Sequence, residues 1–147
     1  MSNSAAYLTL ANFKSTIEAI VSDDAAPAKK FIWYDDLRLS PDQSAGMVRA
    51  FNVRFLDRDG ALETEDTAAH ASETEWLVEV AFPLQYELLE RQRIILNDSR
   101  DLIKALRDDR SYVGVCDSRL FIRGSVVEEG QTACLRQRWR TALFEVE

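Results

Sequence analysis

The chain has few of the residues on which metal sites, disulfide frameworks and irregular backbones depend. Its 147 residues include 1 His, 2 Cys, 3 Pro and 5 Gly. So little Gly and Pro excludes a collagen-like or long low-complexity chain. The two cysteines, Cys116 and Cys134, cannot make a disulfide framework. We expect both to be small, buried apolar residues of a protein in a reducing cytosol.

Long hydrophobic segments are also missing. No apolar run approaches the roughly 20 residues of a membrane-spanning helix, so no membrane partner is expected. The first six residues are rich in Ser and Ala and lack the features of a signal peptide. We expect residues 1–7 to be a flexible N-terminus and residues 1–147 to form one domain.

The chain lacks the basic excess of most DNA-binding domains. It has 18 Lys+Arg against 25 Asp+Glu, a net charge of -7, whereas affinity for DNA comes from neutralising phosphates. Arg outnumbers Lys by 14 to 4. Arg favours bidentate pairing with carboxylates at protein interfaces, although a GC-rich genome explains the same bias.

Hydrophobic periodicity predicts the order α-β-β-β-α-β-β. The pattern predicts helices over 9–21, with Thr9 as N-cap, and over 97–107, capped by Asn97 or Asp98. The stretch 84–95 is ambiguous, and a backward extension of the second helix through Ile95 is the alternative. It predicts strands over 31–39, 47–56, 75–82, 119–127 and 134–146. Because hairpins join antiparallel strands, we expect a single-domain α+β fold, with two helices packed on one face of a mostly antiparallel sheet.

The stretch 57–74 is acidic and reads as a long hairpin tip or exposed loop. It contains Asp57, Asp59, Glu63 and Glu65, but the spacing of an EF-hand calcium loop is absent. We therefore expect a solvated loop rather than a metal site, with a weak divalent-cation site as the alternative. The single histidine, His70, falls in this stretch, and we interpret it as a surface residue.

Motifs for catalysis are absent. The chain has no GxSxG elbow, P-loop, GxGxxG or HExxH. We therefore expect no enzyme activity, no catalytic residue, no metal and no cofactor. An enzyme would need His70 or an acidic cluster to line a pocket.

Two charged segments are candidate interfaces. Arg136, Arg138 and Arg140 alternate along a predicted strand, so their side chains share one face. Like charges on one face repel unless an acidic group neutralises them. That group is either Glu75 or Glu79 across the strand, or a partner. The polar side of the second predicted helix, including Asp98, Arg100 and Asp101, is either solvated or a charged seam between subunits.

The chain resembles the tail terminator proteins of long-tailed bacteriophages, the lambda minor tail protein U type. The resemblance covers the element order of the whole chain. It also includes a strand ending in an aromatic-Pro pair, an Asp-rich helix start and a closing hairpin: Val78–Pro83, Asn97–Ile103, Arg138–Arg140 and Leu143–Val146.

The resemblance implies a structural virion protein at the head-proximal end of the tail, made in the bacterial cytoplasm. Such proteins form a homo-hexameric ring that stops polymerisation of the tail tube protein and joins the tail to a head-completion or neck protein. DNA passes through the lumen only as cargo, to which a net charge of -7 is suited. The Arg stripe would then meet acidic groups of a neighbouring subunit or of the tube, and the acidic stretch 57–74 would be a contact arm.

Other functions stay open at this point. One is a different phage head–tail joining, neck or baseplate subunit. Another is a stand-alone protein-interaction module, which would stay monomeric or dimeric at every concentration.

Overall fold

The computed structural model describes residues 5–22, 30–35, 37, 49–59, 69–83, 87–108, 116, 118–129 and 132–146. Within them the elements are α1 (Ala5–Glu18), β1 (Phe31–Trp33), β2 (Arg49–Asp59), β3 (Ala69–Pro83), α2 (Leu88–Asp108), β4 (Ser118–Glu129) and β5 (Thr132–Val146). The predicted α+β fold and its element order are confirmed.

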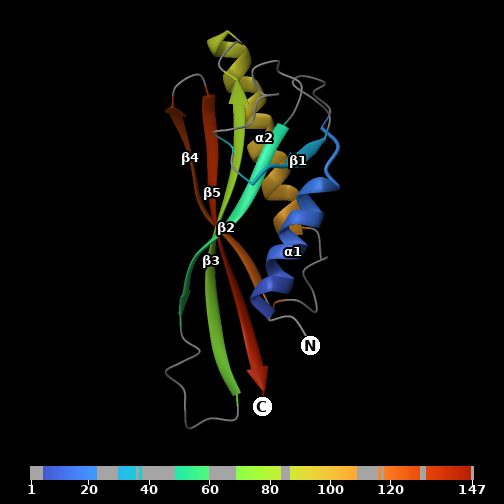
Figure 1. The fold of residues 1–147 in the computed structure, drawn as a ribbon, viewed down its shortest axis with the longest axis vertical. Helices are drawn as coiled ribbons and strands as arrows, with labels where there is room; N and C mark the ends of the chain where they lie inside the picture. Colours follow the sequence, from blue (N-terminus) through green and yellow to red (C-terminus); the bar gives the residue numbers. More distant parts are fainter. Residues whose placement is uncertain are drawn as a thin grey trace.

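The five strands form one sheet in the order β1-β2-β3-β5-β4. Short β1 runs parallel to β2, and the other neighbouring pairs are antiparallel. The long strands β3 and β5 pair along their whole lengths, from Ala69 opposite Val146 to Pro83 opposite Thr132. These strands twist strongly, and the helices lie beside them (Figure 1).

The core lies between the sheet and the two helices. Phe13 and Ile17 of α1 and Leu102 of α2 join one buried cluster with Trp76 and Trp139 of the sheet. The rings of Phe13 and Trp76 are 5.7 Å apart between centroids. Since each Trp buries roughly 150–250 Å², these two residues account for much of the apolar contact. Both helices therefore cover the same face of the sheet, as the periodicity predicts.

Buried ionic and polar groups fix the helices on this face. Arg49 of β2 donates from Nε to Asp98 of α2 at 2.8 Å, and both side chains are fully buried. Arg119 of β4 donates to the Leu106 carbonyl of α2 at 2.6 Å and to Asn12 of α1 at 2.7 Å. Arg119 thus ties one strand to both helices.

Helix α2 is longer than the predicted span 97–107, whereas α1 begins and ends earlier than the predicted span 9–21, since it ends at Glu18. Helix α2 begins at Leu88, so Asn97 and Asp98 lie inside it and cap nothing. The buried bond to Arg49 holds Asp98 there. Helix α1 begins at Ala5 and contains Thr9. The prediction of a flexible N-terminus over 1–7 is therefore wrong for residues 5–7, and residues 1–4 lie outside the described part of the chain.

The stretch 57–74, predicted as a hairpin tip or exposed loop, does lie between the antiparallel strands β2 and β3, but both of its ends are strand. Asp57–Asp59 belongs to β2 and pairs with residues 73–75 of β3, while residues 69–74 of β3 also pair with β5. Main-chain pairing with a neighbouring strand, on both sides for residues 73–75, makes strands of segments whose polar composition suggests a loop. Glu63 and Glu65 lie outside the described residues.

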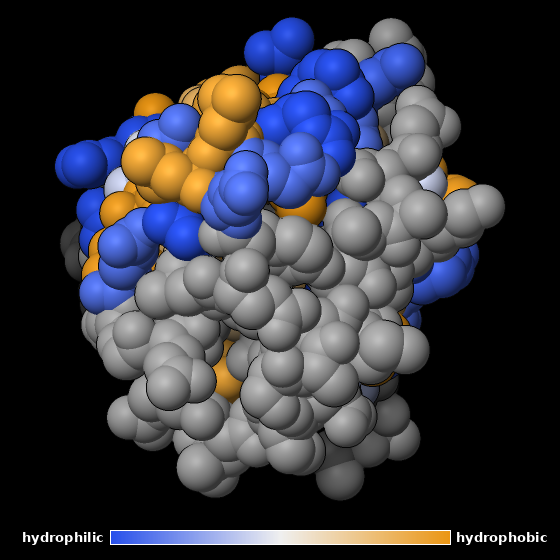
Figure 2. Space-filling model, turned by 90° about the horizontal axis from the view of Figure 1, so that it is seen from above, coloured by the Kyte–Doolittle hydropathy of each residue, from blue (hydrophilic) through white to orange (hydrophobic). Residues whose placement is uncertain are grey.

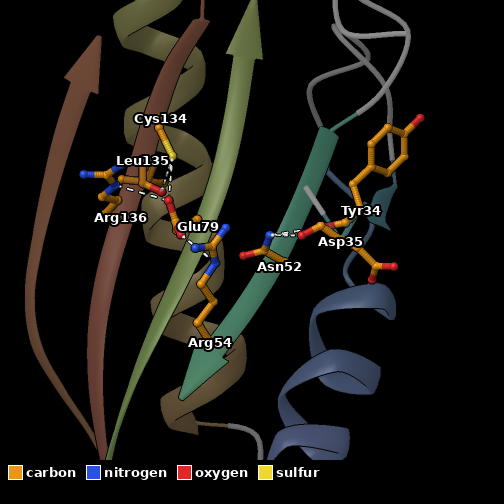
Figure 3. Close-up of polar contacts among 8 residues, drawn as sticks. All are labelled: Tyr34, Asp35, Asn52, Arg54, Glu79, Cys134, Leu135 and Arg136. Carbon is orange, nitrogen blue, oxygen red and sulfur yellow. Dashed lines mark hydrogen bonds and ion pairs between the residues drawn. The ribbon is translucent and has the colours of Figure 1, made fainter. Parts of the chain in front are cut away.

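The opposite face of the sheet has a much smaller apolar cover. Leu37 packs there with Ala50 and Ala81, joined by Tyr34 and Cys134. Asn52 of β2 supports this segment by donating to the main-chain oxygens of Tyr34, at 3.2 Å, and Asp35, at 3.4 Å (Figure 3). We call the remainder of this face, along Arg54, Leu77, Arg123 and the Arg136–Arg140 stripe, the open face.

Candidate interaction surface

The open face carries its charges in rows that cross the strands. Register places Arg54 opposite Leu77, Leu77 opposite Arg138, and Arg138 opposite Arg123. Directly paired residues in neighbouring strands project to the same face. Four strands therefore contribute one row that contains three arginines and no acidic residue.

Glu79 is the centre of the neighbouring row (Figure 3). Its carboxylate accepts from Arg136 Nε at 3.2 Å, lies 3.4 Å from Arg54 Nε, and is 3.4 Å from the Cys134 sulfur. The residue is only 6% exposed although it points away from the helices. The surrounding side chains bury this carboxylate and supply its opposite charge.

Cys134 has an environment that suppresses ionisation of its thiol. Burial, followed by the nearby Glu79 charge, raises the thiol pKa from 9.0 to about 12. The thiolate is the reactive form of cysteine. Cys134 is therefore a structural thiol, but it is only partly buried, so the interpretation of both cysteines as buried residues holds for Cys116 and not fully for Cys134.

Arg140 also has a partner within the chain. It donates to Glu75 at 3.0 Å, its register neighbour on β3. This hydrogen bond raises the pKa of Arg140 above its ordinary value. Of the two interpretations of the Arg stripe, pairing across the strand is therefore observed for Arg136 and Arg140.

Arg138 differs from the other two arginines of the stripe. Its register neighbours are Leu77 on one side and Arg123 on the other, and both arginines are exposed. Within the described residues neither has an ion pair. Like charges directly opposite each other destabilise a sheet. A carboxylate bound between Arg138 and Arg123 would reduce their repulsion.

Strand β4, which contributes Arg123, borders the sheet (Figure 1). Three apolar side chains along it are exposed, namely Leu120, Ile122 and Val126. Edge strands present unpaired main-chain groups that template pairing with another strand. Leu120, opposite Arg140, shares the open face with the arginine pair, whereas Val126, opposite Leu135, projects to the helix-covered face. The candidate interface therefore consists of the arginine pair and the part of the edge around Leu120. The sequence pattern did not single out Arg123.

The helix side also has exposed apolar residues. On α2, Leu88, Leu89 and Leu96 are 59%, 80% and 69% exposed. Leu89 and Leu96 are seven residues apart, so they share one side of the helix. Seen from the end of the molecule where α2 begins, apolar surface lies directly beside hydrophilic surface (Figure 2).

The remaining residues predicted to lie at an interface occupy three different environments. Asp98 is fully buried against Arg49, so its assignment to a surface seam is wrong. Arg100 and Asp101 are closer to solvent and pair with each other at 3.3 Å. Asp57 and Asp59 lie on β2, opposite Glu75 and Glu73 in register.

Within the described ranges no group of three or more His, Cys, Asp or Glu residues is placed to hold a metal ion. His70 lies in β3, opposite Glu145 of β5, rather than in a loop. None of the helices in this part of the chain is both long and apolar enough to cross a membrane.

No protein-family model matches the chain, and no curated protein matches it either.

Proposed function

We propose that this protein is a structural subunit of a bacteriophage tail, a tail terminator that assembles as a ring at the head-proximal end of the tail tube. The observation that carries the proposal is the presence of two unlike uncovered surfaces. One is the open face with its β4 edge, where Arg123 and Arg138 meet without an acid. The other is the apolar row of Leu89 and Leu96 on α2.

A closed ring requires such a pair of surfaces. Subunits related by rotation about a ring axis contact one another through two different patches, one on each side. The sheet provides one candidate patch, and the outer side of α2 provides another or meets the tail tube. Contiguous exposed apolar surface is typical of an interaction site, which supports a partner for the α2 side.

The acidic balance of the chain fits passage of DNA better than retention. A net charge of -7 repels phosphates. In this proposal the partners are other copies of the chain, the tail tube protein and a head-completion or neck protein, and DNA is transient cargo. No catalytic step is assigned.

The proposal is tested by measuring the length of tail tubes that polymerise with and without this protein. The purified protein is added to tail-tube subunits encoded by the same genome while they polymerise, and tube lengths are measured by negative-stain microscopy. The expected result is shorter tubes carrying a ring at one end. Unchanged lengths with no ring on either end would contradict the proposal and favour a stand-alone interaction module.

A further inference from the structure

Positive charge on the open face is concentrated in two neighbouring rows. The row of Leu77 contributes three arginines, and the row of Glu79 contributes one. Glu79 is the acidic member of these rows. The residue is 6% exposed, and its carboxylate already contacts Arg54 and Arg136. We call this group the arginine patch: Arg54, Arg123, Arg136 and Arg138 around Glu79.

The arginine patch ends at the next row along the strands. There the carboxylate of Glu75 accepts a hydrogen bond from Arg140 at 3.0 Å. Farther along, Asp57 and Asp59 of β2 stand opposite Glu75 and Glu73 in register. The basic excess of the open face is therefore local to the patch.

The acidic residues of β4 also stand outside the patch. Glu128 pairs in register with Ala133 of the core cluster and accepts from Arg91 of α2 at 3.2 Å. Its carboxylate therefore lies on the helix-covered side of the sheet. Glu129 stands opposite Thr132, four residues along β4 from Ser125 of the Glu79 row.

We propose that the arginine patch binds side-chain carboxylates of a neighbouring copy of this chain. This inference rests on the proposed ring and names the chemistry of one of its contacts. Arg138 and Arg123 are the main binding groups, because both are exposed and stand opposite each other.

The charge balance of the chain favours a second copy as the occupant. The chain has 18 Lys+Arg against 25 Asp+Glu, whereas the patch has more arginines than acids. The rest of the chain is therefore more acidic than the chain as a whole. A local basic patch on such a protein attracts other copies of it and helps to fix how they meet.

The dimensions of the patch fit a protein surface better than a small anion. Neighbouring strands lie about 4.8 Å apart, so the row from Arg54 to Arg123 crosses roughly 14 Å of sheet. Leu77, which is partly buried, lies within that row. Guanidinium groups bind carboxylates through paired hydrogen bonds. A second copy can place carboxylates on the arginines and an apolar group on Leu77.

Nucleic acid is a poorer occupant of the patch. Its affinity comes from many phosphate contacts along a continuous basic track. Here Glu75 follows directly after the Leu77 row on β3, and the net charge of -7 opposes a long polyanion. Carboxylates on a folded partner need no longer track than this row.

The test compares the self-association of three full-length proteins by sedimentation velocity over a concentration series. They are the native chain, the variant with Arg123→Gln and Arg138→Gln, and a control with Lys14→Gln and Lys30→Gln. The control removes the same charge at two solvent-accessible positions, one on α1 and one beside β1. Circular dichroism checks that all three are folded.

The arginine variant should associate about tenfold more weakly than the native chain at low salt, because the interface loses two of its charged groups. Added salt should weaken the association of the native chain and of the control, since it screens charges that face each other. It should have much less effect on the arginine variant. Unchanged association of the arginine variant, or an equal loss in the control, would overturn the proposal.

A second measurement separates the two classes of occupant. A fluorescently labelled DNA duplex is titrated with the native chain and with the arginine variant at the same salt concentration. The proposal expects weaker binding of the duplex than self-association. Tighter binding that the arginine variant loses would assign the patch to nucleic acid and overturn the proposal.

Failure of this contact and failure of the terminator proposal are distinguishable. A native chain that stays monomeric at every concentration would overturn the contact, while the tube-length measurement still decides the terminator proposal. Self-association that depends on the arginine patch, together with unchanged tube lengths, would support the contact and reject the terminator.

Discussion

The two faces of the sheet differ in how the charges of their arginines are neutralised. On the helix-covered face, Arg49 and Asp98 are fully buried and bonded to each other, and Arg119 bonds to both helices. On the open face, Arg140 pairs with Glu75 near solvent, and Arg138 lies opposite Arg123. On the covered face a buried carboxylate neutralises Arg49, whereas on the open face Arg138 and Arg123 have no ion pair within the described residues.

The largest expected effect comes from breaking the buried pair. Asp98→Ala removes the carboxylate that Arg49 contacts at 2.8 Å inside the core. Removing one partner of a buried ion pair costs about 3–5 kcal/mol. The free energy of unfolding, measured by urea titration, should fall by this amount.

The matched control replaces both partners, with Arg49→Met and Asp98→Leu. Well-packed apolar residues often substitute for a buried pair without loss, so this variant should recover most of the stability. A cost below about 1 kcal/mol for Asp98→Ala would show that the two faces do not differ as described.

The thiol of Cys134 gives the second prediction. Its raised pKa, from 9.0 to about 12, means that the folded chain holds this proton to a higher pH than the unfolded chain. Stability should therefore decrease as pH rises from 9 toward 12. Cys134→Ala should remove that part of the decrease in unfolding measurements over this pH range.

Thiol alkylation checks the same environment. In a Cys116→Ala background, Cys134 should react with iodoacetamide far more slowly than an unperturbed thiol at pH 9. Glu79→Gln removes the neighbouring negative charge and should accelerate the reaction. An ordinary rate in the folded protein would contradict the burial of this network.

The smallest change in stability is expected for the exposed ion pair of Glu75 and Arg140 on the open face. Glu75→Gln weakens its contact with Arg140, whose side chain is 40% exposed. Surface ion pairs contribute about 0–1 kcal/mol and are screened by salt. Thermal unfolding at low and high salt should show a small loss that salt abolishes. A larger loss of stability that high salt does not abolish would show that this pair behaves like the buried pair of Arg49 and Asp98.

The fold follows from the sequence where periodicity is undisturbed. Trp76, Val78 and Val80 alternate inward as expected, and Leu102 and Leu106 face the core from α2. Prediction fails where tertiary contacts override local signals. Asp98 resembles an N-cap because Asp favours that position, but Arg49, 49 residues away in sequence, holds it inside the helix.

The candidate interface was only partly predictable for a similar reason. The stripe of Arg136, Arg138 and Arg140 follows from period 2, yet alternation cannot show which members have partners. Arg123 was hidden by the register shift between Phe121 and Arg123. Strict alternation from Phe121, which packs against the core cluster, would place Arg123 on the covered face, whereas the shift turns it to the open face.

The most direct test of the account is the solution mass of the native chain across a concentration series, followed by negative-stain images of the heaviest species. The expected species is a closed ring with an open centre and the mass of six 16.8-kDa chains. A species that stays monomeric or dimeric at every concentration would contradict the claim that the open face is completed by neighbouring copies.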